Sequence, residues 1–313
     1  MGTPLFTVFT PAYNPGELIA RTYRSLCAQT LRDFEWLVVD DGSSDGTRER
    51  VRNWQAEAAF PIRYFFQENG GKHRAHNRAV REASGDLFAV LDSDDAIMPR
   101  ALERLLFHWL SIPPAERGRF SGVGCLCVDS CSRTVGRPLP HSVLDCRHYE
   151  IDARFGAVGE KWGFHRTSVL REFPFPEITG ERFCPDAVVW NRIATRYLVR
   201  HVNEALRIYH SGRDGITANH SALMAHSPHG ARLYYKLYLE LPVPIWWKAR
   251  RAVNYVRFSL HGGVPAKKIL SDSPVALLSA AGTPPAVALY AWDRLRFRVA
   301  HPRSLHTGVT ETA

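Results

Sequence analysis

The chain has 313 residues, 45% of them hydrophobic, and a net charge of +9. This length allows a large core in one catalytic domain with an extension, or in two modest domains. Residues 241–313 hold ten Lys and Arg against three acids, and because this Trp-rich segment has no nucleic-acid motif, we expect it to meet an anionic membrane surface and no nucleic acid.

Short apolar runs alternate with helical periodicity through the first hundred residues. Strands are predicted at residues 5–10, 35–40, 62–66 and 87–91. Helices are predicted at residues 16–29, from Ser44 or Asp45 onward, at residues 72–83 and from Pro99 onward. This order predicts an α/β fold with a mainly parallel sheet covered by helices on both faces. Ligands of such sheets lie beyond the carboxyl ends of the strands.

Polar and glycine residues follow all four predicted strands. The segments are Thr-Pro-Ala-Tyr-Asn at 10–14, Asp-Asp-Gly-Ser-Ser-Asp-Gly at 40–46, Glu-Asn-Gly-Gly-Lys at 68–72 and Asp-Ser-Asp-Asp at 92–95. Any one of them would also suit an ordinary turn. Crowded carboxylates repel one another, however, and the fourth segment favours a hard metal ion. Asp92 and Asp94 would face the same way if the strand persists, whereas Asp95 would face the other way or open the next turn.

The first strand lacks the G-x-G-x-x-G that a dinucleotide-binding fold places after it. The segments at residues 10–14, 38–47, 69–77 and 91–95 instead resemble the nucleotide-sugar domain of family 2 glycosyltransferases, which have the GT-A fold. The resemblance continues to about residue 220. It implies an inverting transferase that moves a sugar from a nucleotide diphosphate donor, expected to be a UDP-sugar. The acceptor would be a hydroxyl of a lipid-linked or polysaccharide molecule in cell-envelope synthesis.

The resemblance also implies donor-binding residues. Tyr13 would pack on the uracil, although a core aromatic is the alternative, and Asp41 would hydrogen-bond the base. Gly71 would let the backbone approach the ligand, and Lys72 would meet phosphate or base oxygens unless it is merely solvated. The implied donor contacts are Pro11, Tyr13, Asp41, Gly71, Lys72, Asp92, Ser93 and Asp94.

Asp92 and Asp94 match the D-x-D of the family, whose carboxylates bind the ribose and a divalent ion, Mn²⁺ or Mg²⁺, that bridges the phosphates. Asp95 is an alternative ligand to Asp92. His210 is a further candidate ligand from a lid at residues 211–220, although a solvent-facing or hydrogen-bonded histidine is the commoner case. The implied metal ligands are thus Asp92, Asp94, Asp95 and His210.

Asp186 matches the position of the family's catalytic base, with Pro-Asp where the family more often has Glu-Asp, Thr-Glu or Pro-Glu. The alternative is an acid that merely favours a helix N-terminus. On the acceptor side the resemblance indicates Glu160, Glu181 and Arg182. Two other functions stay open: a nucleotide-sugar-binding module without turnover, and a nucleotidyltransferase, which would usually carry a glycine-rich basic loop after the first strand.

The six cysteines are scattered, and Cys125, Cys127 and Cys131 lack a Cys-x-x-Cys pair, so we expect buried thiols in a reducing cytoplasm and no zinc site. We expect a catalytic domain at 1–220, with a nucleotide-binding half at 1–110 and an acceptor half and lid at 111–220. A basic, aromatic helical extension at 221–303 and a disordered tail at 304–313 would follow.

The extension contains nineteen uncharged residues at 274–292, which Gly282 to Pro285 interrupt. This pattern predicts two short helices in a membrane interface. A transmembrane span and a helical hairpin packed on the catalytic domain are the alternatives. The expected location is the inner face of the cell membrane, and the sequence leaves the oligomeric state open.

Overall fold

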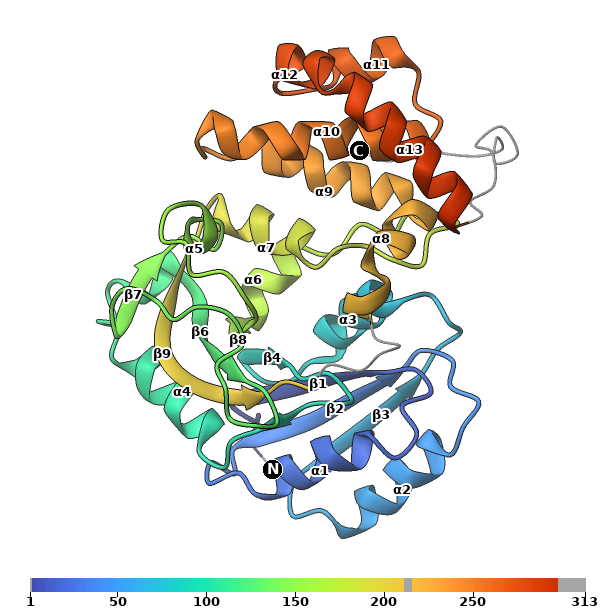
Figure 1. Cartoon of the computed structure of the whole chain (residues 1–313). Helices are drawn as coiled ribbons and strands as arrows, with labels where there is room; N and C mark the ends of the chain where they lie inside the picture. Colours follow the sequence, from blue (N-terminus) through green and yellow to red (C-terminus); the bar gives the residue numbers. More distant parts are fainter. Residues whose placement is uncertain (1, 211–215, 298–313) are drawn as a thin grey trace. The chain divides into compact units, whose positions relative to one another are not determined.

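The computed structural model describes residues 2–210 and 216–297, so the predicted disordered tail at 304–313 lies outside the described residues (Figure 1). The chain forms two compact units. The first comprises Met1–Phe175 and Ile193–Ser211, and the second Pro176–Arg192 and Gly212–Ala313. The segment that carries Asp186 therefore groups with the C-terminal residues.

A sheet of nine strands, counted over the described residues, forms the centre of the first unit, in the order β3-β2-β1-β4-β8-β6-β9-β5 with β7 beside β9. The strands are β1 (Phe6–Ala12), β2 (Phe34–Asp40), β3 (Ile62–Phe66), β4 (Leu87–Val90), β5 (Ala96–Ile97), β6 (Phe120–Val128), β7 (Val143–Cys146), β8 (Lys161–Arg166) and β9 (Leu198–Ile208). β5, β7 and β8 are antiparallel to their neighbours and the other six strands run in one direction. The predicted mainly parallel sheet is confirmed.

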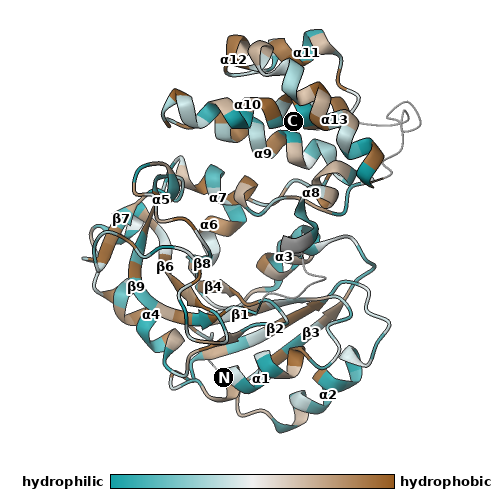
Figure 2. Ribbon diagram, in the orientation of Figure 1, coloured by the Kyte–Doolittle hydropathy of each residue, from teal (hydrophilic) through white to brown (hydrophobic). Residues whose placement is uncertain are grey.

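Helices cover both faces of this sheet, as the alternating pattern predicts. Those of the first unit are α1 (Ile19–Cys27), α2 (Thr47–Glu57), α3 (Lys72–Glu82), α4 (Ala101–Leu110), α5 (Glu150–Ala153) and α6 (Thr167–Glu172). Phe6 and Val8 of β1 share a buried cluster with residues of α1, α2 and α4. Phe9 points to the opposite face, where its ring contacts His76 of α3. Figure 2 shows hydrophobic residues along β1 and β2, as expected for strands buried on both faces.

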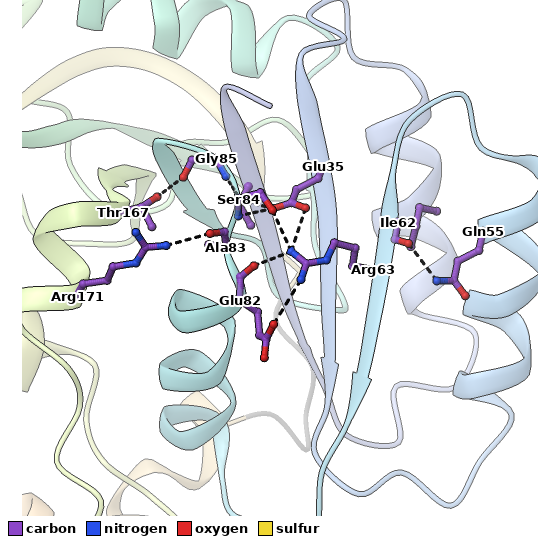
Figure 3. Close-up of polar contacts among 11 residues, drawn as sticks. Glu35, Gln55, Ile62, Arg63, Glu82, Ala83, Ser84, Gly85, Thr167 and Arg171 are labelled. Carbon is purple, nitrogen blue, oxygen red and sulfur yellow. Dashed lines mark hydrogen bonds and ion pairs between the residues drawn. The ribbon is translucent and has the colours of Figure 1, made fainter. Parts of the chain in front are cut away.

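The amino ends of the parallel strands are tied together around the buried carboxylate of Glu35 at the start of β2 (Figure 3). Its Oε1 accepts hydrogen bonds from the Thr7 hydroxyl (2.6 Å) and the Ser84 N–H (2.8 Å). Arg63 of β3 lies 3.4 Å from its Oε2 and donates to the Glu82 carbonyl (2.6 Å). One carboxylate therefore connects β1, β2, β3 and the turn before β4. This satisfies a buried charge that would otherwise be costly.

The second unit is helical in its described part. Its helices are α7 (Ala187–Ala194, whose last two residues belong to the first unit), α8 (Ile216–His226), α9 (Pro228–Glu240), α10 (Ile245–His261), α11 (Ala266–Ser271), α12 (Ala276–Ala281) and α13 (Thr283–Phe297). α10 packs against α9, α12 and α13 around the buried side chains of Leu239, Tyr255 and Val256. None of the helices in the described ranges is long and apolar enough to span a bilayer.

Several element boundaries differ from the predictions. α4 begins at Ala101, two residues after Pro99, and β4 ends at Val90. Residues 216–220 of the predicted lid are the first residues of α8 rather than a loop, while its residues 211–215 lie outside the described part of the chain. The uncharged stretch does form two short helices, α12 and α13, with Gly282 between them.

Candidate functional site

The carboxyl ends of β1 to β4 meet at one edge of the sheet because the four strands are parallel. At the end of β1, Tyr13 is 59% exposed, so it is not a core aromatic and its ring is available to a ligand. Asn14 follows with φ of 47°, a conformation that asparagine tolerates better than most residues. Its N–H donates to the Ser43 hydroxyl (2.9 Å) and its Oδ1 accepts from the Ser44 N–H (2.8 Å). These bonds join the first two loops of the site.

Asp41 organises the loop that follows β3. Its buried carboxylate accepts hydrogen bonds from the Gln67 amide (2.7 Å), the Gly70 N–H (2.9 Å) and the Gly71 N–H (2.7 Å). Gly71 has φ of 98°, which only glycine adopts readily. Asp41 thus positions the Gly-Gly turn directly before α3, and its predicted contact with a base stays a prediction.

The four residues after β4 form a turn rather than a continued strand. The Asp95 N–H donates to the Asp92 carbonyl at 3.1 Å, so the strand does not persist to Asp94, which was the condition for Asp92 and Asp94 to face the same way. Helix α1 holds the turn from the side, because Arg21 donates to the Asp94 carbonyl (2.7 Å) and Thr22 to the Asp95 carbonyl (2.9 Å). These hydrogen bonds hold the backbone of the turn against α1.

Arg207, near the end of β9, binds two of these carboxylates. Its Nε donates to Asp95 Oδ2 at 2.7 Å, its Nη2 contacts the same oxygen, and Nη2 also donates to Asp92 Oδ2 at 3.2 Å. The pairing of Ile97 in β5 with Arg207 in β9 brings them together, since Asp95 directly precedes β5. The sequence analysis missed Arg207, although three neighbouring acids require more than one cation.

Lys72 is the first residue of α3, and its Nζ lies 2.8 Å from Asp92 Oδ1. Asp92 is therefore held between Lys72 on one oxygen and Arg207 on the other. Although burial opposes the charged form, these two cations hold the pKa of Asp92 below its ordinary value. Lys72 is thus part of the site rather than a merely solvated side chain.

Asp94 has a different environment. Its partly buried carboxylate has no ion-pair partner within the described ranges, and burial together with the charge of Asp92 raises its pKa. A raised pKa means that the charged form of Asp94 is disfavoured in this environment, and a nearby cation would favour that form. Within residues 2–210 and 216–297, Asp94 is the one of the three acids that forms no ion pair.

The neighbouring groups restrict the choice of metal ligands. Asp95 is nearly inaccessible and is engaged by Arg207 and by the His210 N–H (2.8 Å), which makes it a poorer candidate than Asp94. The His210 ring lies beside it, with Nδ1 at 3.9 Å from Asp95 Oδ1. Burial and the nearby Arg21 lower the pKa of His210, which favours the neutral, ligating form.

Over residues 2–210 and 216–297, no cluster of three or more His, Cys, Asp or Glu side chains is arranged as a metal site. Mg²⁺ at a diphosphate, however, usually needs only one or two protein carboxylates, because the phosphates and water supply the other oxygens. The unpaired Asp94, with Asp92 beside it, matches that requirement. Asp94 and Asp92 therefore fit a divalent ion whose other ligands are oxygens of a bound nucleotide and water.

The predicted acceptor-side residues have separate environments. Glu160 directly precedes β8, whose antiparallel pairing with β4 places it at the same sheet edge as the aspartates. Trp162 fastens this pairing by donating to the Val90 carbonyl (2.6 Å). In the second unit, Arg182 is exposed.

Glu181, also in the second unit, has a structural role at the start of a helix. Its buried carboxylate accepts from the N–H groups of His229 (2.7 Å) and Gly230 (2.8 Å) and from the His229 ring (2.9 Å). It therefore caps the amino end of α9, where free N–H groups favour an anion. Its predicted place on the acceptor side stays a prediction.

Asp186 directly precedes α7, and its carbonyl accepts the first helical hydrogen bonds, from the N–H groups of Val189 (3.1 Å) and Trp190 (3.3 Å). The residue is exposed, as a base that meets substrate must be, but that position also suits a carboxylate at a helix start. In the same unit, burial lowers the pKa of His220 while the charge of Asp186 opposes the shift. Its predicted role as the base stays a prediction.

Cys125 and Cys127 are buried in β6, and burial raises the pKa of both thiols, which keeps them protonated. Cys131 is exposed in the turn that follows. These environments agree with packing thiols rather than with zinc ligands.

Residues 7–116, which contain all four loops of this edge, match the family model of Glycosyl transferase family 2. Over this range the chain is similar to glycosyl transferase family 2. The recognition made from the four loop segments is thereby confirmed. The matched range ends shortly after α4, so it covers the first unit only in part and does not include β9 or Arg207.

Two curated relatives illustrate the extent of the similarity. The chain is 39% identical over 117 residues to validoxylamine A glucosyltransferase of Streptomyces hygroscopicus, which is 36% of this chain and 27% of the relative. It is 36% identical over 103 residues to the putative teichuronic acid biosynthesis glycosyltransferase TuaG of Bacillus subtilis, 33% of this chain and 41% of the relative. The chain spans about a third of the length of several curated relatives it matches.

Solved structures resemble this chain over a longer range than the curated relatives do. S. aureus TarS 1–349 in complex with UDP-GlcNAc has a TM-score of 0.62 at 16% identity, covering 94% of this chain and 91% of that one. The mannosyltransferase PcManGT from Pyrobaculum calidifontis, in complex with GDP-Man and Mn²⁺, has a TM-score of 0.53 at 22% identity, covering 97% and 83%. At such identities the likeness concerns the fold, and it confirms the predicted GT-A fold with a C-terminal helical extension.

Proposed function

We propose that this protein is an inverting glycosyltransferase that transfers a sugar from a UDP-sugar to a hydroxyl group of a glycan or lipid-linked acceptor. The observation that carries the proposal is the unpaired Asp94 carboxylate, next to an Asp92 that Lys72 and Arg207 hold in place, at the carboxyl edge of a family 2 domain. The nucleotide sugars bound by two proteins of similar fold support a nucleotide-sugar donor.

Each loop of the edge has a physical task in this proposal. The exposed Tyr13 ring offers a flat face to the base, and Asp41 holds the Gly70 and Gly71 backbone against the donor. Lys72, at the amino end of α3, carries positive charge toward the phosphates. The remaining predicted donor contacts, Pro11 and Ser93, adjoin these loops.

Asp94 and Asp92 would hold a divalent ion, Mn²⁺ or Mg²⁺, with His210 as a further candidate ligand. When bound, such an ion neutralises the charge that develops on the departing diphosphate. Asp186 would remove the proton from the acceptor hydroxyl as that oxygen attacks the anomeric carbon from the face opposite the diphosphate. A single displacement of this kind inverts the configuration at that carbon.

The acceptor proposal rests on the names of relatives and on the C-terminal helices. TuaG is named for teichuronic acid biosynthesis, which supports a cell-envelope glycan. A lipid-linked form of such an acceptor would place the protein at the inner face of the cell membrane. The donor sugar and the linkage are left open.

The test is UDP release from a panel of UDP-sugars with Mn²⁺ or Mg²⁺ and envelope glycan acceptors. We expect Asp94→Asn and Asp186→Asn to lower kcat/KM at least about a hundredfold. Glu57→Gln, an exposed carboxylate at the end of α2, is the matched control and should leave it unchanged. Equal release from wild type and Asp186→Asn would refute Asp186 as the base. Donor binding without release would indicate a binding module, and pyrophosphate release from nucleotides a nucleotidyltransferase.

A further inference from the structure

Helix α13 carries apolar side chains on its outward face as well as on its inward face, and its inward face also holds a buried charge. Its inward face consists of Ala286, Tyr290, Asp293 and Phe297, spaced at one side of the helix and buried or half-buried. The outward face is apolar, with Trp292 at 60% and Leu295 at 80% exposure. A surface helix of a water-soluble protein normally has polar or charged side chains on its outward face.

The inward charge of α13 is well compensated. Asp293 is 1% exposed, and its carboxylate accepts from Arg257 Nε (2.6 Å) and Nη2 (2.5 Å) of α10. The His261 ring, also on α10, lies 3.0 Å from Asp293 Oδ2. These contacts fix which side of α13 faces the bundle. The ion pairs of Asp293 therefore direct the opposite, apolar side of α13 outward.

Helix α12 continues the apolar surface. Leu277 is 90% exposed, and Ala276, Ala280 and Ala281 are exposed around it. No charged residue occurs between positions 274 and 292, and Figure 2 shows hydrophobic residues on α12 and along α13. Contiguous exposed apolar surface of this kind marks an interaction site. We call the exposed residues of α12 and α13 the apolar face.

The charges that flank the apolar face are positive. Exposed Lys267 and Lys268 lie on α11, which packs beside α12, and Arg296 is exposed near the end of α13. The two acids between residues 262 and 297, Asp272 and Asp293, are paired with Arg232 and Arg257 of α9 and α10. The flanking cations therefore keep their net charge.

We propose that the apolar face and its flanking cations dock the protein on the surface of an anionic lipid bilayer. Exposed leucine and tryptophan side chains enter the acyl boundary, while Lys267, Lys268 and Arg296 meet anionic headgroups. A second copy of this chain fits less well, because a symmetric contact would bring the same cations together. The inference extends the proposed acceptor location but does not depend on sugar transfer.

The test is flotation of the full chain with vesicles of phosphatidylcholine alone or mixed with about an equal amount of phosphatidylglycerol. We expect binding to the mixed vesicles that weakens with salt. Leu277→Ser combined with Leu295→Ser should lower affinity at least about tenfold. The control pair Leu110→Ser and Val158→Ser, exposed leucine and valine of the first unit, should not lower it.

A second set of variants tests the contribution of the flanking cations to membrane binding. Lys267→Gln with Lys268→Gln should weaken binding to the mixed vesicles by about fivefold per cation. Arg52→Gln with Arg81→Gln, exposed cations of the first unit, should leave binding unchanged. Circular dichroism checks the fold of each variant, and the changed side chains are all exposed.

Several outcomes would overturn the proposal. Flotation that the Leu277/Leu295 variant leaves unchanged would exclude the apolar face as the docking surface. A concentration-dependent dimer in sedimentation velocity that this variant abolishes would assign the face to a second copy. Because UDP release with a water-soluble acceptor is measured separately, failure of vesicle binding is distinguishable from failure of the proposed activity.

Discussion

Replacement of Arg207 by methionine tests whether one guanidinium holds the carboxylates after β4 in place. Asp95 is 1% exposed at its side chain and Arg207 is 8% exposed, so Arg207→Met leaves a buried carboxylate without its main partner. Removal of one member of a buried ion pair costs about 3–5 kcal/mol of unfolding free energy. For a unit of this size that corresponds to a fall of about 6–20 °C in Tm.

Arg200→Met is the matched control, because Arg200 lies on the same strand and also forms a two-bond ion pair, with Asp145 at 2.8 and 2.7 Å. Asp145 is 33% exposed, so this pair should contribute only about 0–1 kcal/mol. Urea unfolding of the full chain measures the loss of unfolding free energy in both variants. The double variant Arg207→Met/Asp95→Asn should recover part of the loss, since the unpaired charge is gone. An Arg207→Met cost no larger than that of Arg200→Met would refute the reasoning.

Three further predictions concern single groups. Lys72→Met should weaken UDP affinity at least about tenfold in calorimetry, because a charged partner of the phosphates is lost; unchanged affinity would contradict its role. Burial lowers the pKa of His165 to about 3, so below pH 6.5 the unfolded chain takes up a proton that the folded chain does not, and stability falls as pH falls. His165→Gln should flatten that slope by about 1.4 kcal/mol per pH unit in urea titrations between about pH 6 and 4, and an unaltered slope would exclude the histidine. Glu181→Gln should destabilise the second unit by about 1–2 kcal/mol without changing the acceptor KM, whereas a KM effect in a stable variant would support its acceptor role.

Local signals predicted the framework of the first unit. The four strands and three helices up to residue 90 follow from hydrophobic periodicity, and each predicted strand lies within two residues of the observed one. The parallel direction of these strands then predicted that the loops after their carboxyl ends lie at one edge of the sheet. The prediction worked because buried parallel strands are nearly all apolar, as the Trp36–Val39 run in β2 shows.

Contacts between residues far apart in the sequence could not be predicted from these local patterns. Arg207 meets Asp95 over 112 positions, through the pairing of β5 with β9. Glu181 has the acidic character of a site residue, but the amino end of α9, forty-eight positions further on, engages its carboxylate. Propensity and motif spacing describe neighbours in sequence, whereas both of these carboxylates are assigned by tertiary partners.

The carboxylate of Glu35 joins the amino ends of the parallel strands, at the edge opposite the loops that carry Tyr13, Asp41 and Asp94. Anchorage and recognition are thereby placed on different sides of one sheet. The contacts of Glu35 that join the strand ends involve none of the residues of those loops.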